Sequence, residues 1–120
     1  AEIGETCNMP CAPAVDHALA GASVIVNPAA SPVLVTGREY RNTQVKAQSG
    51  RLVCGYICSN AGEGESTTVV VYDAHSLIAD NGEILAERES FGCGLMITEL
   101  DLQLLELMEK WEALAEEAEG

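Results

Sequence analysis

The chain has 120 residues, 48% of them hydrophobic, and a formal net charge of −13 from 19 acidic and 6 basic residues. This length suits a single domain with a core of its own. The negative charge argues against nucleic acid or an anionic membrane as a partner, because both are polyanions that would repel the chain.

Five cysteines lie at positions 7, 11, 54, 58 and 93. An odd number at scattered positions does not suit a disulfide framework, so we expect free thiols and a cytoplasmic protein. The two Cys-x-x-x-Cys spacings differ from the two-residue gap typical of zinc turns, and we expect no metal site. We also expect no signal peptide and no membrane span, since no apolar run has the required length.

The first half of the chain predicts alternating strands and helices. Residues 1–3 resemble the inside of a strand, so we expect the chain to begin partway through a structure. Residues 13–22 predict a short helix, because a proline suits its first turn and a glycine its end. Residues 23–27 are apolar on both sides of the pleat, which predicts a strand in the middle of a sheet covered on both faces. A capping box at 36–39 predicts a helix that Gly50 ends.

The second half predicts mainly strands. We expect strands at 52–58, 67–72 and 94–98, separated by a loop rich in glycine and glutamate at 60–65. Asn81-Gly82 predicts a β-hairpin between strands at 75–79 and 83–87, because both turn residues tolerate positive φ. The fold class is therefore mixed α/β, with helices packed on a mixed sheet.

Residues 101–120 predict an acidic, amphipathic C-terminal helix. Leu104, Leu107, Met108, Trp111, Leu114 and Ala115 form one apolar stripe at helical spacing, and five glutamates occupy the other face. The glutamates suit a solvated surface. We expect the stripe to dock on the sheet of this domain, with another subunit or a further domain as the alternatives.

The segment GETCNMPCAP, residues 4–13, raises the question of a cysteine nucleophile. A cysteine just past a strand and beside a helix N-terminus can have its thiolate stabilised there, so Cys7 is a candidate catalytic residue. Cys11 is a weaker one. His17 and His75 belong to no Cys/His or Ser/His/Asp arrangement, and we expect both to be structural.

Several motifs together resemble one family. They are ALAGAS at 18–23, VIVN at 24–27, RLVCGY at 51–56, AGEGESTT at 61–68 and HSLIADNGEILAE at 75–87. The chain resembles the C-terminal half of the nitrilase-like glutaminase domain of glutamine-dependent NAD synthetases, from residue 1 to about residue 103. AGEGESTT is the narrowest of these signals and disfavours a different nitrilase-type amidase.

The resemblance implies part of an α-β-β-α sandwich over residues 1–120. It also implies a parent enzyme that hydrolyses glutamine and passes the ammonia to a synthetase domain. It implies no cofactor for this domain, and ATP and Mg²⁺ only for the synthetase domain. The family's catalytic Glu and Lys would lie upstream of residue 1.

The ungapped match to the family places Gly4, not a cysteine, at the position of the nucleophile. Cys7 could take that role only in a gapped register that sacrifices the matches at Glu2 and Ile3. Glycine cannot form the thioester intermediate of this chemistry. The resemblance also implies that Glu5 and Ser31 bind substrate, whereas a basic position of the family falls at Gly37, one residue before Arg38.

Two functions follow as hypotheses. The first is a fragment of a glutamine amidohydrolase domain that is inactive alone, with glutamine as the substrate of the parent domain. The alternative is a non-catalytic assembly module, a homo-oligomer formed through helices or through the exposed face of a half sandwich.

Overall fold

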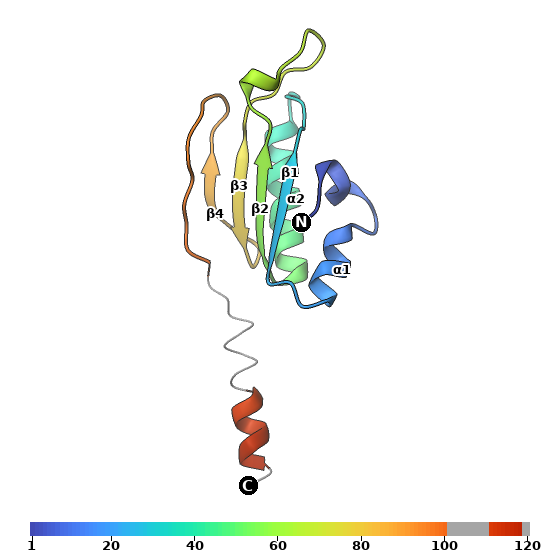
Figure 1. The fold of residues 1–120 in the computed structure, drawn as a ribbon, viewed down its shortest axis with the longest axis vertical. Helices are drawn as coiled ribbons and strands as arrows, with labels where there is room; N and C mark the ends of the chain where they lie inside the picture. The colour runs from blue at the N-terminus through green and yellow to red at the C-terminus, as the bar shows by residue number, and fades with distance from the viewer. Residues whose placement is uncertain (101–110, 119–120) are drawn as a thin grey trace.

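The computed structural model describes residues 1–100 and 111–118. Helices and strands alternate in the first half, and a hairpin closes the sheet (Figure 1). In chain order the elements are η1 (Gly4–Asn8), α1 (Pro13–Leu19), β1 (Val24–Ala29), α2 (Gly37–Leu52), β2 (Gly55–Asn60), η2 (Glu63–Glu65), β3 (Ser76–Asp80) and β4 (Glu83–Arg88).

The four strands form one mixed sheet in the order β1-β2-β3-β4. β1 and β2 are parallel and are joined through α2, whereas β2, β3 and β4 pair antiparallel. A parallel pair needs such a crossover, because the chain must return to the same end of the sheet. The predicted mixed α/β fold class is confirmed.

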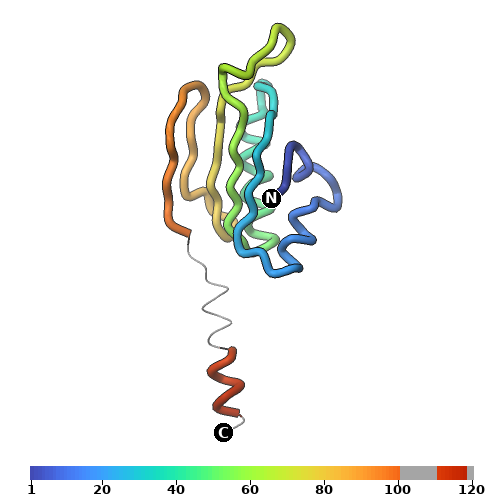
Figure 2. Tube along the Cα trace, viewed as in Figure 1, coloured from blue at the N-terminus to red at the C-terminus, as the bar shows by residue number. Residues whose placement is uncertain are grey.

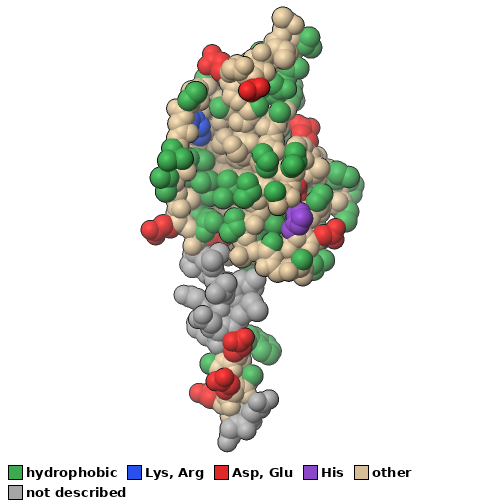
Figure 3. Space-filling model, in the orientation of Figure 1, with side chains coloured by type: hydrophobic (Ala, Val, Ile, Leu, Met, Phe, Trp, Pro, Cys, Tyr) green, Lys and Arg blue, Asp and Glu red, His purple; other side chains and the backbone are tan. Residues whose placement is uncertain are grey.

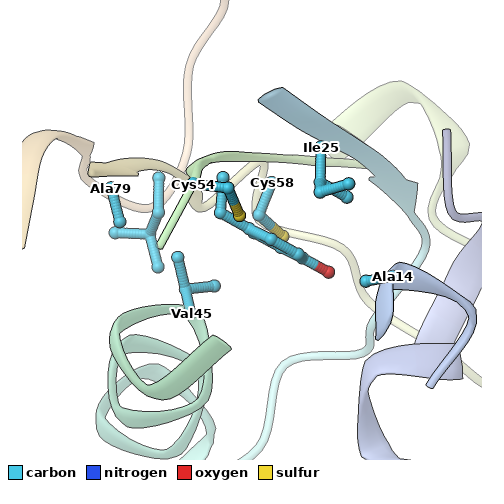
Figure 4. Packing of buried hydrophobic residues seen from close by; sticks show 8 residues of the cluster. Ala14, Ile25, Val45, Cys54, Cys58 and Ala79 are labelled. Atoms are coloured by element: carbon cyan, nitrogen blue, oxygen red, sulfur yellow. The ribbon is translucent and has the colours of Figure 1, made fainter. Parts of the chain in front are cut away.

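The core lies between α1, α2 and one face of the sheet. Ile25 on β1, Tyr56 on β2 and Ala79 on β3 point to this face, and Val45 of α2 and Ala14 of α1 pack against it. Figure 4 shows Val45 rising from α2 toward Ala79 and Cys54, with Ala14 near Ile25 at the other end of the cluster. Burial of these side chains provides the hydrophobic contribution that holds the helices on the sheet.

The other face of the sheet is largely open. Val24 is 37% exposed and Val26 42% exposed, and hydrophobic side chains form a band across this face (Figure 3). The prediction that residues 23–27 form a central strand covered on both faces is wrong, since β1 is an outer strand of the described sheet. An apolar sequence shows that a strand is suited to burial on both faces. Whether both faces are covered depends on which other elements pack against the sheet.

The β3–β4 hairpin is confirmed. Asn81 and Gly82 adopt φ values of 47° and 87°, which suit the predicted turn. Gly82 lies so close to α2 that a Cβ built on it would stand 3.5 Å from the Cα of Gly50. The turn therefore packs against the helix, and the positive φ of Gly82 is the feature that favours glycine there.

The helix α2 is longer than predicted. Gly50 lies inside the helix, which continues to Leu52 and ends at Val53 with a left-handed φ of 49°. The strand predicted from Leu52 consequently begins at Gly55. The capping box is also wrong, because the Thr36 side chain makes no hydrogen bond to the helix N-terminus.

Two predicted strands are absent from the described part of the chain. Residues 67–72 fold into a turn in which the Thr67 hydroxyl accepts hydrogen bonds from the N–H groups of Val69 and Val70. Residues 94–98 form no ladder, and the Arg88 side chain lies against Gly92 and Gly94. High β-propensity alone does not make a strand, because strand formation depends on packing against neighbouring strands and on burial.

Residues 111–118 are helical and all of them are exposed. Trp111 is 75% exposed and Leu114 62% exposed, and the helix stands away from the sheet (Figure 2). For this part of the apolar stripe the prediction of docking on the domain's own sheet is wrong. The stripe residues before position 111 lie outside the described residues. No helix in the described ranges is both long and apolar enough to cross a bilayer.

Candidate functional site

A cavity of about 150 Å³ lies where η1, the C-terminal end of β1 and α2 meet. A space of this size holds a molecule about as large as benzene. Residues from four segments line it: Gly4, Glu5, Cys7, Asn8, Asn27, Ala29, Ser31, Pro32, Leu34, Gly37, Tyr40, Arg41, Gln44, Val45 and Cys58. The cavity therefore brings together Gly4, Glu5, Cys7 and Ser31, four of the positions that the sequence nominated, but not Cys11.

The buried carboxylate of Glu2 anchors the start of the chain. Its Oε2 accepts a hydrogen bond from the backbone N–H of Ala14 at 2.7 Å, and its Oε1 accepts one from the Tyr56 hydroxyl at 3.0 Å. The Glu2 N–H donates to the carbonyl of Val26 at 2.8 Å. The first residues are thus tied at once to α1, β1 and β2, which positions η1 beside the sheet.

Asn27 completes this anchor from β1. Its Nδ2 donates to the carbonyls of Glu2 at 2.8 Å and Gly4 at 3.0 Å, and its Oδ1 accepts from the Cys58 thiol at 3.7 Å. The side chain is 1% exposed, so each of these bonds replaces one to water. The carbonyl of Gly4 is therefore held in a defined place on the cavity wall.

Gly4 has a φ of +73°, and a Cβ built on it would meet no atom within 4 Å. A side chain at this position would have open space before it, on the wall of the cavity. Gly4 therefore lines the cavity without providing a nucleophile, and its positive φ favours glycine over residues with a side chain.

Cys7 lines the same cavity but is not activated. Its Sγ lies 3.7 Å from Asn8 Oδ1. Burial raises the pKa of the Cys7 thiol, and the nearby carboxylates of Glu2 and Glu5 raise it further. Since the thiolate is the nucleophile, a raised pKa leaves Cys7 mostly protonated and unreactive near neutral pH. No lysine is among the residues that line the cavity.

Cys58, the second thiol on the cavity wall, is also protonated. Burial raises its pKa to about 11, although the Arg41 guanidinium acts in the opposite direction. All five cysteines of the chain are unpaired, with Cys11 exposed and away from the cavity lining. Neither thiol of the cavity therefore has the environment of a catalytic cysteine.

Asn60 holds the loop that carries Ser31. Its Oδ1 accepts from the Ser31 N–H at 2.8 Å, and its Nδ2 donates to the Ser31 carbonyl at 3.2 Å. The loop is fixed through its backbone, and no hydrogen bond within the described residues occupies the Ser31 hydroxyl. Ser31 therefore presents a free hydroxyl at the cavity, while Glu5 is exposed on the opposite segment, η1.

The sequence reasoning missed Arg41, Tyr40 and Gln44 of α2. These residues share a helix face with Gly37, and that spacing of three and four residues was the available signal. Arg38 points elsewhere, since its Nε pairs with Glu87 Oε1 at 2.9 Å and it does not line the cavity. The cation at the cavity is thus one helical turn later than expected.

His75 is fully buried beside this helix. Its Nδ1 lies 2.6 Å from Arg41 Nη1, and its Nε2 lies 2.8 Å from Glu87 Oε1. Arg38 and Asn42 also donate to Glu87 Oε1. Partial burial would raise the pKa of Glu87, but these hydrogen bonds outweigh it and hold the pKa below its usual value. His17 is half-buried on α1 and does not line the cavity.

The chain was compared with known proteins. No family model matches it. It is 38% identical over 106 residues to glutamine-dependent NAD(+) synthetase of Mycobacterium tuberculosis, which covers 87% of this chain and 16% of that protein. The corresponding Mycobacterium leprae enzyme gives the same identity and coverage. The chain thus spans about a sixth of the length of these relatives.

Solved structures of glutamine-dependent NAD(+) synthetases and of a carbon-nitrogen hydrolase are also similar to this chain. A crystal structure of a glutamine-dependent NAD(+) synthetase from Cytophaga hutchinsonii is 28% identical, with a TM-score of 0.61 over 74% of this chain and 13% of that one. A carbon-nitrogen hydrolase from Helicobacter pylori shares the fold alone, with 18% identity and a TM-score of 0.69 over 94% of this chain and 43% of that one.

The first prediction concerns the Glu2 anchor. Replacing Tyr56 by Phe removes one hydrogen bond to a buried carboxylate, so we expect the free energy of unfolding in urea to fall by about 1.5–3 kcal/mol. The matched control is Tyr40→Phe, because the Tyr40 hydroxyl accepts a bond from Gln44 at an exposed position. We expect it to change the free energy by less than about 0.5 kcal/mol. Equal effects of the two variants would contradict the anchor.

The second prediction concerns the Cys7 thiol. Because its pKa is raised, we expect iodoacetamide to alkylate Cys7 more slowly at pH 7.5 than it alkylates the same residue in urea. The rate should keep rising with pH beyond the range where an unperturbed thiol is fully ionised. Peptide mapping by mass spectrometry resolves Cys7 from Cys11. Faster alkylation in the folded chain than in urea would show an activated nucleophile.

Proposed function

This chain is homologous to a segment of the nitrilase-like domain of glutamine-dependent NAD synthetases, and from that premise we propose its function. It is part of a glutamine amidohydrolase domain whose parent supplies ammonia for NAD synthesis. By itself the segment does not hydrolyse glutamine. The observation that carries this proposal is Gly4, which lines the cavity next to Glu5 and has no side chain.

The chemistry explains why Gly4 matters. In a cysteine-dependent glutaminase, a thiolate attacks the side-chain amide carbon of glutamine, ammonia leaves, and water then hydrolyses the thioester. The step needs a thiolate, and a basic group that receives and returns the proton. Gly4 has no sulfur, the pKa of Cys7 is raised, and no lysine lines the cavity. What remains is a cavity with groups suited to binding.

An ammonia-release assay tests this proposal. We expect the 120-residue chain incubated with glutamine to release no more ammonia than a blank, and Cys7→Ala and Cys11→Ala to leave that result unchanged. Loss of a nucleophile lowers turnover by several orders of magnitude, so the contrast is large. Turnover that Cys7→Ala abolishes and Cys11→Ala preserves would make Cys7 the nucleophile and overturn the proposal.

The open face of the sheet favours a second function, an assembly module that pairs with another copy of this chain. Val24 and Val26 are exposed there, and Leu95 and Ile97 on the neighbouring segment are 86% and 80% exposed. A contiguous apolar patch of this kind is costly in water and marks an interaction surface. A symmetric pair of such faces would bury it against itself.

Sedimentation equilibrium tests the assembly function. At high micromolar concentration we expect self-association that Val26→Asp weakens at least tenfold, because a carboxylate would be desolvated in the interface. The matched control is Val69→Asp, which places the same charge on an exposed loop away from the sheet face. A chain that remains monomeric at that concentration would contradict the assembly function.

A further inference from the structure

The β3–β4 turn carries a reactive pair of residues outside the cavity. Asn81 is exposed, and the backbone nitrogen of Gly82 follows it directly in the chain. A nucleophile held next to its target reacts as if at high local concentration, and glycine has no Cβ to hinder the approach. The other asparagines of the chain each precede a residue that has a Cβ: Asn8, Asn27, Asn42 and Asn60. Asn81 is therefore the asparagine best suited to attack by the backbone nitrogen that follows it.

The reaction is the deamidation of asparagine, and water is the co-reactant that it consumes. The Gly82 nitrogen gives up its proton to solvent and forms a bond to the side-chain amide carbon of Asn81. The bond from that carbon to the amide nitrogen breaks, and the amide nitrogen takes up a proton and leaves as ammonia. Water then opens the resulting succinimide at either of its carbonyls. One opening gives aspartate, and the other gives isoaspartate, in which the backbone runs through the former side chain and is longer by a methylene.

A hydrogen bond to α2 holds the Gly82 nitrogen. Its N–H donates to the Ser49 hydroxyl at 3.1 Å, and that hydroxyl donates its own hydrogen to the carbonyl of Cys54 at 2.9 Å. A hydroxyl has one hydrogen and two lone pairs, so Ser49 receives the Gly82 N–H on an oxygen lone pair. Ser49 is fully buried. In the closed turn the proton that must be lost is therefore bound to Ser49 and is not open to a base from solvent.

Packing holds the same residue against the helix. A Cβ built on Gly82 would stand 3.5 Å from the Cα of Gly50 and 3.9 Å from the carbonyl oxygen of Lys46, so the turn lies on the last part of α2 (Figure 1). The succinimide has no N–H at this nitrogen, so the hydrogen bond to Ser49 is lost during the reaction. The reaction therefore needs an opening of the turn, which native proteins reach locally without unfolding as a whole.

We propose that Asn81 is a site of spontaneous deamidation, and that the Ser49 hydroxyl and the packing of the turn on α2 restrict the reaction to the opened turn. Both products work against closing. Each adds a carboxylate beside Asp80 and Glu83 in a chain with a net charge of −13. Isoaspartate also lengthens a turn that packs closely against Gly50. The modification thus weakens the contact that delays it.

Peptide mapping of the 120-residue chain during incubation at mildly alkaline pH tests the inference. Trypsin cleaves after lysine and arginine, so Asn60 and Asn81 fall in the same peptide, residues 52–88, and fragmentation in the mass spectrometer tells them apart. We expect Asn81 to deamidate, whereas Asn60, which alanine follows, stays intact over the same period. In urea that unfolds the chain, we expect Asn81 to react about tenfold faster or more, because the turn is then always open.

Two variants separate the local contact from the stability of the whole chain. Ser49→Ala removes the acceptor of the Gly82 N–H, so we expect Asn81 in the folded chain to deamidate about three- to tenfold faster, as for the loss of one hydrogen bond. The matched control is Tyr56→Phe, which weakens the Glu2 anchor but leaves the turn intact. We expect it to change the rate by less than about twofold. Circular dichroism compares the folding of the variants.

Several outcomes would overturn the inference. They are an Asn81 that stays intact even in urea, equal rates in the folded chain and in urea, and an unchanged rate in Ser49→Ala. Equal acceleration by Ser49→Ala and Tyr56→Phe would show that global unfolding controls the reaction, and it would overturn the role of Ser49. If Ser49→Ala does not fold, the comparison of the folded chain with urea decides. No glutamine is added in these experiments, so their outcome is independent of the proposed function.

Discussion

The hydrogen-bonded carboxylate of Glu2 is the interaction on which this end of the molecule depends. A buried carboxylate costs several kcal/mol unless donors replace the water that it loses. Here the Ala14 N–H of α1 and the Tyr56 hydroxyl of β2 replace the lost water as hydrogen-bond donors to Glu2. Burial and the adjacent carboxylate raise the pKa of Tyr56, so the hydroxyl remains a donor. Because Asn27 binds the carbonyls on either side of Ile3, η1 stays against the outer strand.

A second polar network holds the opposite wall of the cavity. His75 and Glu87 fix Arg41 on α2, while Asp73 accepts the His75 N–H at 3.1 Å and the Ser90 hydroxyl at 2.8 Å. Each wall is thus positioned by buried or half-buried groups that come from other elements. This division explains how the cavity keeps its shape although Gly4 contributes no side chain to it. Asn27 and Arg41 belong both to these networks and to the lining, so the networks hold part of the cavity wall in place.

Local signals in the sequence were reliable where one interaction decided the structure. The Asn81-Gly82 turn and the proline at the start of α1 are such cases, because positive φ and a fixed φ are properties of single residues. Signals failed where the outcome depended on a distant partner. Gly50 was expected to end a helix but lies inside α2, and residues 67–72 fold into a turn instead of a strand.

For the site, the sequence alone determined the chemistry that is present: glycine at position 4 and carboxylates at positions 2 and 5. Only the tertiary structure decided which of these groups meet. It brought Gly4, Glu5 and Cys7 of η1 and Arg41 of α2 into the lining of one cavity, and it buried His75 between Arg41 and Glu87. The physical reason is that the pKa, the nucleophilicity and the ligand contacts of a side chain depend on its burial and on neighbours that lie far away in the sequence. The residue type alone does not specify these surroundings.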